Sequence, residues 1–297
     1  MYIDANTLSV GLQNTNEYND GRDGNCVTNV NDNKDRHDCD EDDDDGDIDG
    51  PKVEAHVDLA KIPCKYCMSI SKVYLLTSTV YNGIHPEDIS TEIEQFNLID
   101  LIQQFIYDQQ HPDHASSSDT SAPVLPTFHG KIAVYSSAVA TFHAPSDISG
   151  IGGMRREQIR AVKSWRKGPG HYDTIFVNTD PSTEGMRGLS IARVRLFFSF
   201  SFGGSKYPCA LVHWFSSVGD LPDDLTGMWV VEPETSNDGE PLASVIHLDT
   251  IVRASHLLPV FSQDFVSKTI SFTDTLDTFN SFYVNKYIDH HAFEIAF

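Results

Sequence analysis

Basic residues are scarce in this chain. Among its 297 residues there are 21 Lys and Arg against 43 Asp and Glu, which gives a formal net charge of −22. Residues 1–50 alone carry 15 acids and 3 bases. Because binding to a nucleic-acid backbone requires clustered positive charge, this composition excludes a protein that coats nucleic acid non-specifically along its whole length. Residues 121–297, with 18 acids and 14 bases, are closer to neutral and escape that exclusion.

Long apolar runs and paired cysteines are also lacking. No stretch approaches the roughly 18 apolar residues that a membrane-spanning helix requires. The N-terminal residues do not combine a basic segment with an apolar one, so a secretory signal is not expected. The five cysteines are odd in number and widely spread, which is typical of reduced thiols in an intracellular protein. We therefore expect no membrane partner and a nuclear or cytoplasmic location.

The usual catalytic signatures are missing as well. The sequence contains no GxSxG elbow, Walker A run, HExxH helix or GxGxxG fingerprint. We therefore predict no catalytic residue, no cofactor and no small-molecule substrate. The alternative is a metal-dependent hydrolase or nuclease whose carboxylates converge only in the fold. The carboxylates considered for it are Asp220, Asp224, Glu232 and Asp249.

The N-terminal part divides into an acidic tail and a helical segment. Residues 1–50 are rich in Asn, Asp and Gly, and like charges at this density repel, so we predict a disordered acidic tail. Residues 51–114 form the predicted helical segment. Thr91 stands three residues before Glu94, a capping-box spacing, and apolar residues then recur at helical intervals over residues 93–106.

A change of pattern follows residues 115–126, whose Ser, Thr, Ala and Pro content indicates a linker. Residues 127–297 contain short β-prone runs joined by turns, with no alternation of strands and helices. The clearest run, residues 192–202, alternates between two faces and reverses at residues 203–206 into a second strand. We predict an α+β protein with a mainly antiparallel, barrel-like β domain, for which a small SH3- or BAH-like barrel is one possibility. The predicted core residues are Leu196, Phe198, Phe200, Leu211, Val230, Ile246 and Leu257.

Positive charge gathers in one place. Residues 155–167 contain six bases and one acid, and we predict that they form a basic helix inserted in the β domain. Arg156, Arg160, Lys163 and Lys167 would share one face of that helix. A glycine-rich turn before it would leave backbone N–H groups at the helix N-terminus, an arrangement that suits a phosphate. The candidate nucleic-acid-binding residues are Arg155, Arg156, Arg160, Lys163, Trp165, Arg166 and Lys167, and the candidate phosphate loop is Gly150, Gly152 and Gly153.

Cys64 and Cys67 have the spacing of one half of a zinc site. A structural zinc ion requires four ligands, and no second pair follows nearby. They are therefore a weak candidate metal site. The third functional hypothesis is a small metal-stabilised interaction module around these two cysteines.

Several segments of the sequence resemble those of one family. The segments are residues 146–156, 173–178, 188–199, 207–215, 227–232, 245–259 and 282–291. In their order along the chain and in their amino-acid sequences, they resemble the C-terminal region of Plavaka/KDZ-associated DNA transposon proteins of mushroom-forming fungi, and the resemblance covers residues 54–297. In that family the catalytic core lies upstream and has no counterpart here. The resemblance therefore implies an accessory module and transfers no catalytic residue.

These observations predict a non-catalytic accessory or binding module. It would contact DNA or a protein partner through residues 155–167. The competing interpretation is a surface segment whose bases pair with the protein's own surplus of acids.

Overall fold

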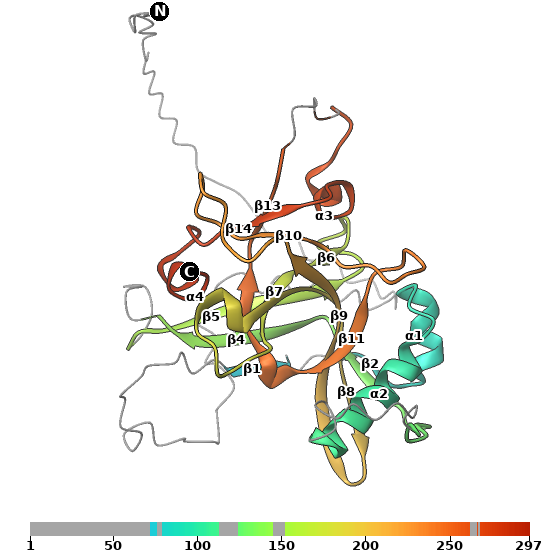
Figure 1. The fold of residues 1–297 in the computed structure, drawn as a ribbon. Helices are drawn as coiled ribbons and strands as arrows, with labels where there is room; N and C mark the ends of the chain where they lie inside the picture. Colours follow the sequence, from blue (N-terminus) through green and yellow to red (C-terminus); the bar gives the residue numbers. More distant parts are fainter. Residues whose placement is uncertain (1–71, 76–78, 113–123, 145–151, 262–265, 267) are drawn as a thin grey trace, which may run out of the picture. The chain divides into compact units, whose positions relative to one another are not determined.

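The computed structural model describes residues 72–75, 79–112, 124–144, 152–261, 266 and 268–297 (Figure 1). All of them belong to one compact unit, Cys64–Phe297. The predicted acidic tail lies outside the described residues, as do Cys64, Cys67, Gly150 and most of residues 115–126. No helix among the described residues is long and apolar enough to cross a membrane.

The described part of the chain is built mainly of strands. The strands are β1 (Lys72–Leu75), β2 (Thr79–Ile84), β3 (Ile132–Tyr135), β4 (Ser137–His143), β5 (Met154–Val162), β6 (His171–Tyr172), β7 (Thr174–Asn178), β8 (Leu189–Phe202), β9 (Ser205–Ser217), β10 (Val230–Pro233), β11 (Ala243–His247), β12 (Ile251–Ser255), β13 (Leu257–Pro259) and β14 (Phe282–Val284). The α-helices are α1 (Pro86–Glu92), α2 (Leu98–Gln110), α3 (Thr275–Thr278) and α4 (His290–Ile295), and the 3-10 helices are η3 (Gly185–Gly188), η4 (Leu248–Thr250) and η5 (Phe272–Asp274).

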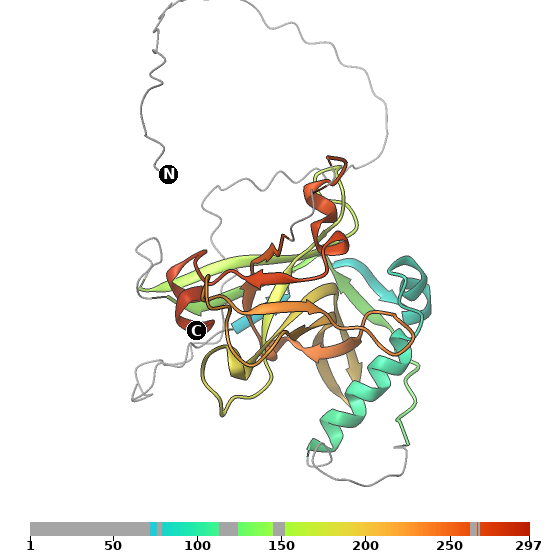
Figure 2. The same cartoon turned by 45° about the horizontal axis from the view of Figure 1, so that its top comes forward.

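The strands form two antiparallel sheets. The larger sheet has the order β12-β7-β8-β9-β10-β14-β13, with β11 also paired to β9 and β3 joining β2 to β8. It curls into a half-barrel, against which the smaller sheet β1-β4-β5-β6 and the helices lie (Figures 1 and 2). This arrangement confirms the predicted α+β class with a mainly antiparallel, barrel-like domain.

The hairpin of β8 and β9 lies in the middle of the larger sheet, as predicted. Its two strands pair from Ile191 and Phe215 to Phe202 and Ser205. Gly203 and Gly204 connect them with φ angles of 59° and 83°. Two central residues at positive φ are the arrangement of a type I′ turn, which glycine adopts without steric cost and which matches the twist of the strands.

A β-bulge interrupts the predicted alternation along β8. The register against β9 shifts between Val194 and Leu196, so Arg195 is the extra residue. Val194 packs in the apolar cluster between the two sheets, whereas Leu196 and Phe198 pack in the cluster under α2. Before the bulge, the even-numbered residues of β8 therefore pack between the two sheets, and after it they pack under α2.

The predicted core residues divide into two groups. The four on β8 and β9 are buried, and the three on β10, β11 and β13 are half-buried. The four buried residues are Leu196, Phe198, Phe200 and Leu211.

The helical pattern forms two helices instead of one. Pro86 begins α1, and Thr91 lies inside this helix, so the predicted capping box is wrong. The chain leaves α1 through Glu94, at φ 58°, and the N–H groups of Glu94 and Gln95 donate to the carbonyls of Thr91 and Ser90. This is the Schellman pattern of helix termination, with glutamate where glycine is common. Helix α2 follows and buries Ile102 against β8 and β11.

The predicted basic helix over residues 155–167 is also wrong. Residues Met154–Val162 form strand β5, which pairs with β4 from Met154 to Arg160 and with β6 at Ala161 and Val162. Residues 154–162 favour helix by composition, but the two neighbouring strands pair its backbone, and Ile159 and Ala161 are buried between the sheets. Tertiary pairing and burial therefore override local propensity.

Candidate nucleic-acid interface

Strand β5 has two chemically different faces, because successive side chains of a strand point to opposite sides. Arg156, Gln158 and Arg160 lie on the outward face, where the first two are exposed. Arg160 donates to Gln158 Oε1 at 3.1 Å. Two of the bases that the helix prediction placed on one face, Arg156 and Arg160, thus also share one face of the strand.

The loop between β5 and β6 carries the remaining bases. Lys163, Arg166 and Lys167 are exposed in it. Arg166 and Lys167 have φ angles of 48° and 60°, and the Gly168 N–H donates to the Trp165 carbonyl at 2.7 Å. This is again the geometry of a type I′ turn, but with two cationic residues where Asn-Gly is the preferred pair.

Trp165 organises the arginines of this hairpin. The guanidinium of Arg160 lies 4.5 Å from the centre of the Trp165 ring, and that of Arg166 lies 5.6 Å from it. His171 of β6 lies at the same ring, with a centroid separation of 6.5 Å. Cation–π contacts of this kind hold guanidinium groups near an aromatic face without neutralising their charge.

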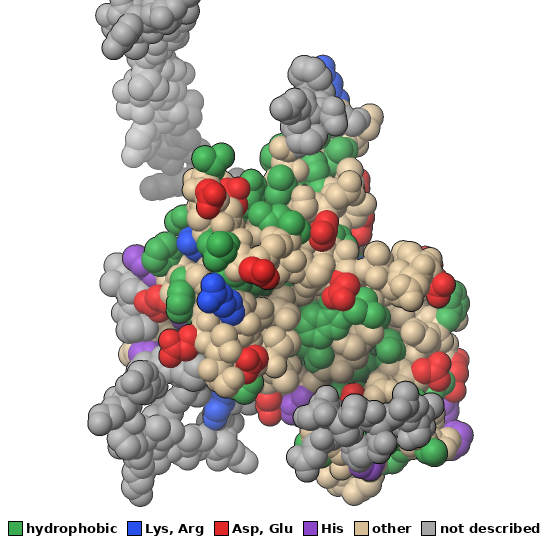
Figure 3. Space-filling model, viewed as in Figure 1, with side chains coloured by type: hydrophobic (Ala, Val, Ile, Leu, Met, Phe, Trp, Pro, Cys, Tyr) green, Lys and Arg blue, Asp and Glu red, His purple; other side chains and the backbone are tan. Residues whose placement is uncertain are grey.

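The face of the molecule shown in Figure 3 has a different character. On the face shown in Figure 3, acidic side chains are scattered among apolar and neutral ones, and Lys and Arg are few. No ion pair with a described carboxylate is present for Arg156, Lys163 or Arg166. We name the outward face of β5 and its turn, residues 156, 158, 160 and 163–167, the cationic hairpin.

The glycine turn leads into a strand instead of a helix. Gly152 and Gly153 have φ angles of 62° and 77°, and the Ala144 N–H donates to the Gly153 carbonyl at 2.6 Å. The predicted phosphate loop required the N–H groups of a helix N-terminus, and β5 offers none. That part of the prediction is therefore wrong for Gly152 and Gly153.

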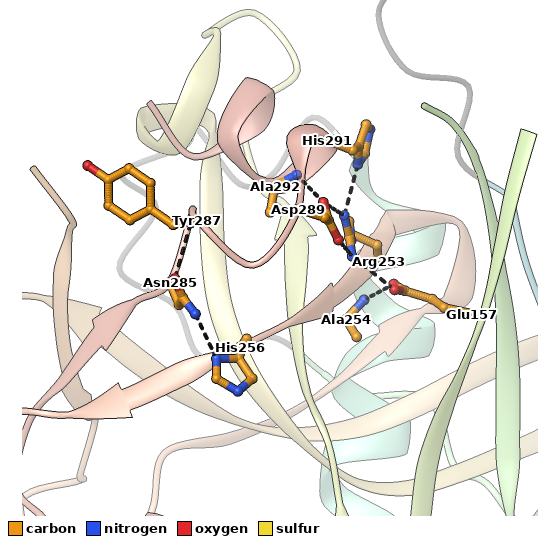
Figure 4. A network of polar contacts seen from close by, with 9 residues as sticks. All are labelled: Glu157, Arg253, Ala254, His256, Asn285, Tyr287, Asp289, His291 and Ala292. Carbon is orange, nitrogen blue, oxygen red and sulfur yellow. Dashed lines mark hydrogen bonds and ion pairs between the residues drawn. The ribbon is translucent and has the colours of Figure 1, made fainter. Parts of the chain in front are cut away.

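The inward face of β5 holds a buried ionic network (Figure 4). Arg253 of β12, only 4% exposed, donates from Nη1 and Nη2 to the two carboxylate oxygens of Asp289, at 2.8 and 2.7 Å. Its Nη2 also donates to Glu157 Oε2 at 3.0 Å, while Glu157 Oε1 accepts from the Ala254 N–H at 2.6 Å. Asp289 in turn caps α4 by accepting from the Ala292 N–H.

The two carboxyl groups of this network respond differently to burial. Burial raises the pKa of Glu157 above its ordinary value, despite the nearby Arg253. Burial acts in the same direction on Asp289, but the hydrogen bonds from Arg253 and Ala292 outweigh it and lower the pKa of Asp289 to about 2. Asp289 is therefore the principal anionic partner of Arg253.

His291 completes the network as a neutral group. Its Nδ1 lies 3.3 Å from Arg253 Nη1, which has only protons to donate, so Nδ1 is the acceptor. Burial first, and then the charge of Arg253, lower the pKa of His291 to about 4. The imidazole stacks on Phe142 with a centroid separation of 4.5 Å. This network joins β5, β12 and α4, and its role is structural.

The residues of the enzyme hypothesis lie on separate elements. Glu232 is on β10, Asp249 is in η4, and Asp220 and Asp224 are in the loop between β9 and β10. Within the described ranges, no group of three or more His, Cys, Asp or Glu side chains is placed to hold a metal ion. Cys64 and Cys67, the other candidate metal ligands, lie outside these ranges.

Sequence patterns located the cationic hairpin but missed the ionic network. The sequence prediction includes Arg155 among the binding residues, although the strand turns Arg155 and Glu157 toward the inward face. Arg253 carries no local motif, because its side-chain partners lie 36 to 96 residues away in the chain. The available signal was the single acid, Glu157, within a run of bases.

The chain was also compared with known proteins. No protein-family model matches it. No curated protein and no solved structure matches it either.

Proposed function

We propose that this domain is a non-catalytic accessory module that binds DNA through the cationic hairpin. The observation that carries the proposal is the gathering of five bases on one face and at the tip of a single hairpin, in a protein of net charge −22. Against such a background, local clustering of positive charge is the feature that a phosphate backbone selects.

The change from helix to strand keeps the proposal physically sound. Contacts to phosphate require clustered positive charge and can be made from the face of a sheet, without an element that enters a groove. Strand β5 pairs with β4 from Met154 to Arg160 and with β6 only at its end, so Arg156 and Arg160 project from the face of a sheet. Arg166 and Lys167 occupy the tip of the turn that follows. Guanidinium groups held on Trp165 keep their N–H donors available for bidentate bonds to phosphate.

The strained turn gives independent support. Residues other than glycine at positive φ cost about 1 kcal/mol or more each and persist where the surroundings or a function maintain them. Arg166 and Lys167 occupy two such positions in succession at an exposed tip. A requirement for positive charge at this tip explains residues that the turn alone disfavours.

The resemblance to fungal transposon proteins is part of this proposal. A module that lacks the upstream catalytic core of that family would position DNA or a protein partner for another chain. A nuclear or cytoplasmic location follows from the same proposal and from the five unpatterned cysteines.

The test is binding of a fluorescent DNA duplex by the full-length chain over a range of salt concentrations. We expect salt-sensitive binding that is lost in the triple variant Arg156→Glu, Arg160→Glu, Lys163→Glu. Because each phosphate contact contributes about 0.9 to the slope of log affinity against log salt, removal of these bases lowers that slope by about 2 to 3.

The matched control reverses three exposed bases away from the hairpin, at Arg187, Lys206 and Lys268. It makes the same change in net charge and should bind within about twofold of the wild-type chain at fixed salt. Equal loss in both variants, with unfolding midpoints unchanged, would show that only net charge matters. Absence of any salt-sensitive binding by the wild-type chain would reject DNA as the ligand and leave a protein partner to be sought.

A further inference from the structure

A second cationic cluster lies on β8 and β9, away from the cationic hairpin. Arg193 and Arg195 project from β8, and His213 of β9 is the register partner of Arg193. Apolar residues flank this row on both sides of the same sheet face. Ile191 and Phe215 belong to the cluster under β10 and β14, and Leu196 and Leu211 to the cluster under α2. The cationic row thus separates two apolar cores.

The β-bulge explains why a charged side chain stands there. Val194 and Val212 pack into the core between the two sheets. Because Arg195 is the extra residue of the bulge, no residue of β9 lies opposite it. Bulges re-aim side chains in this way and are common beside functional sites.

The two arginines of the row are compensated unequally. Arg193 forms a bidentate pair with Asp277, with N–O distances of 2.5 and 3.2 Å. Arg195 has no ion pair or hydrogen bond to any described residue. Its guanidinium carbon lies 4.5 Å from the centre of the Tyr172 ring, a cation–π contact. Its Nε is buried without a hydrogen-bond partner among the described residues. Burial, followed by repulsion from Arg193, lowers the pKa of Arg195 below its ordinary value.

His213 adds a neutral polar group to the same row. Its Nε2 lies 3.0 Å from Gln95 Oε1, an acceptor, so Nε2 carries the proton in this contact. Gln95 is delivered by the turn after α1, in which Glu94 has a positive φ. Burial first, then Arg195 and Arg193, lower the pKa of His213 to about 4. Burial and the neighbouring arginines together keep His213 neutral.

We propose that Arg195, with Arg193 and His213, forms a binding site for an oxoanion, either a phosphate group or a carboxylate. A half-buried guanidinium with unused donors is costly unless it is paired, and its planar fork matches the oxygens of these two groups. Asp277 and Glu94 attract Arg195 from a distance, but neither forms an ion pair with it, and Asp277 is bonded to Arg193. Arg195 retains partial exposure, so a ligand from solution can reach it.

The experiment titrates the full-length chain with inorganic phosphate and, separately, with acetate, in a chloride buffer at constant ionic strength. The imidazole resonance of His213, assigned as the signal missing in His213→Gln, is followed by NMR. We expect a saturable shift with one of the two anions. Preference for phosphate identifies a phosphate group as the natural ligand, and preference for acetate identifies a carboxylate.

Substitutions then locate the site. Arg195→Gln should weaken binding of the preferred anion at least tenfold, and Arg195→Lys, which keeps the charge but loses the fork, should weaken it by less. Arg187→Gln, which removes an exposed arginine elsewhere, should leave the affinity within twofold. The triple variant of the cationic hairpin should also retain anion binding, which separates this proposal from the proposed function.

Two outcomes overturn the proposal. One is the absence of a saturable His213 shift with either anion in the wild-type chain. The other is a shift whose midpoint is unchanged in Arg195→Lys. If Arg195→Gln does not fold, the wild-type titration and Arg195→Lys decide the matter by themselves.

Discussion

The two faces of β5 show how one strand handles charge in opposite ways. On the inward face, Arg253 forms ion pairs with both Glu157 and Asp289. On the outward face, the side chains of Arg156 and Arg160 form no ion pair with a described carboxylate, although the Arg160 backbone N–H donates to Asp173 Oδ2 at 2.7 Å, and Trp165 supports Arg160 by a cation–π contact. The inward charged groups are paired with one another, as buried ions must be to offset their desolvation. The outward arginines leave positive charge available to another molecule.

This contrast separates residues that maintain the fold from residues that are available for binding. A buried ion pair repays its desolvation only when all its members are present. An exposed base contributes little to stability, so its removal should leave the fold unchanged. Substitutions on the inward face should therefore change stability, and those on the outward face should change binding.

The largest effect is expected at Arg253. Replacement by methionine, Arg253→Met, leaves Glu157 and Asp289 buried without their counter-ion and should lower the free energy of unfolding by about 3 to 5 kcal/mol. Denaturant titration measures this loss. Arg187→Met, at an exposed position, should change stability by less than about 0.5 kcal/mol. Similar losses in the two variants would contradict a special role for the inward network.

A smaller, pH-dependent effect is expected at His291. In the unfolded chain its pKa is near 6.5, whereas in the fold burial and Arg253 lower it to about 4. Between these values only the unfolded state binds the proton, so stability falls as the pH falls. His291 should contribute about 2 kcal/mol of loss between pH 7 and pH 5.

The measurement is denaturant unfolding at both pH values. His291→Gln should reduce the loss by that amount, and His290→Gln, which changes the exposed neighbour, should not. His213 titrates over the same window, because its pKa is also lowered to about 4, so a residual loss in His291→Gln is expected. An unchanged pH dependence in His291→Gln would show that this imidazole is protonated as easily in the fold as in solution.

Much of the fold was predictable from sequence, because it depends on local alternation. The runs that form β3, β4, β7, β8 and β9 are β-prone, β7 and β8 carry period-two patterns, and the Gly203-Gly204 turn marks the central reversal. The helical pattern correctly indicated α2. It did not show where the helices begin, since Pro86 and the turn at Glu94 decide that.

The candidate site was less predictable. Residues 155–162 have helical composition, and only the pairing of β5 with β4 and β6 makes them a strand. The bulge at Arg195 depends on the register with β9, which no local pattern gives. The ionic network joins residues of three distant segments. Composition found the positive charge but not its geometry.

The smallest expected effect tests the strained turn of the cationic hairpin. In the double variant Arg166→Asn, Lys167→Gly, the pair preferred by a type I′ turn replaces two cationic residues at positive φ. We expect the free energy of unfolding to rise by about 1 kcal/mol and DNA affinity to fall, because relief of strain and loss of charge occur together. Denaturant titration and DNA binding are measured on the same preparation.

The β8–β9 turn supplies the matched control. Gly203→Asn creates the same Asn-Gly pair at a turn of the same geometry and removes no base, so it should leave DNA affinity unchanged. A double hairpin variant that is less stable than the wild type would show that the Arg166-Lys167 turn is not strained. A more stable variant with undiminished DNA affinity would show that the strain serves something other than charge at the tip. Only a gain in stability joined to a loss of binding fits an outward face of β5 shaped for contact with an anionic partner.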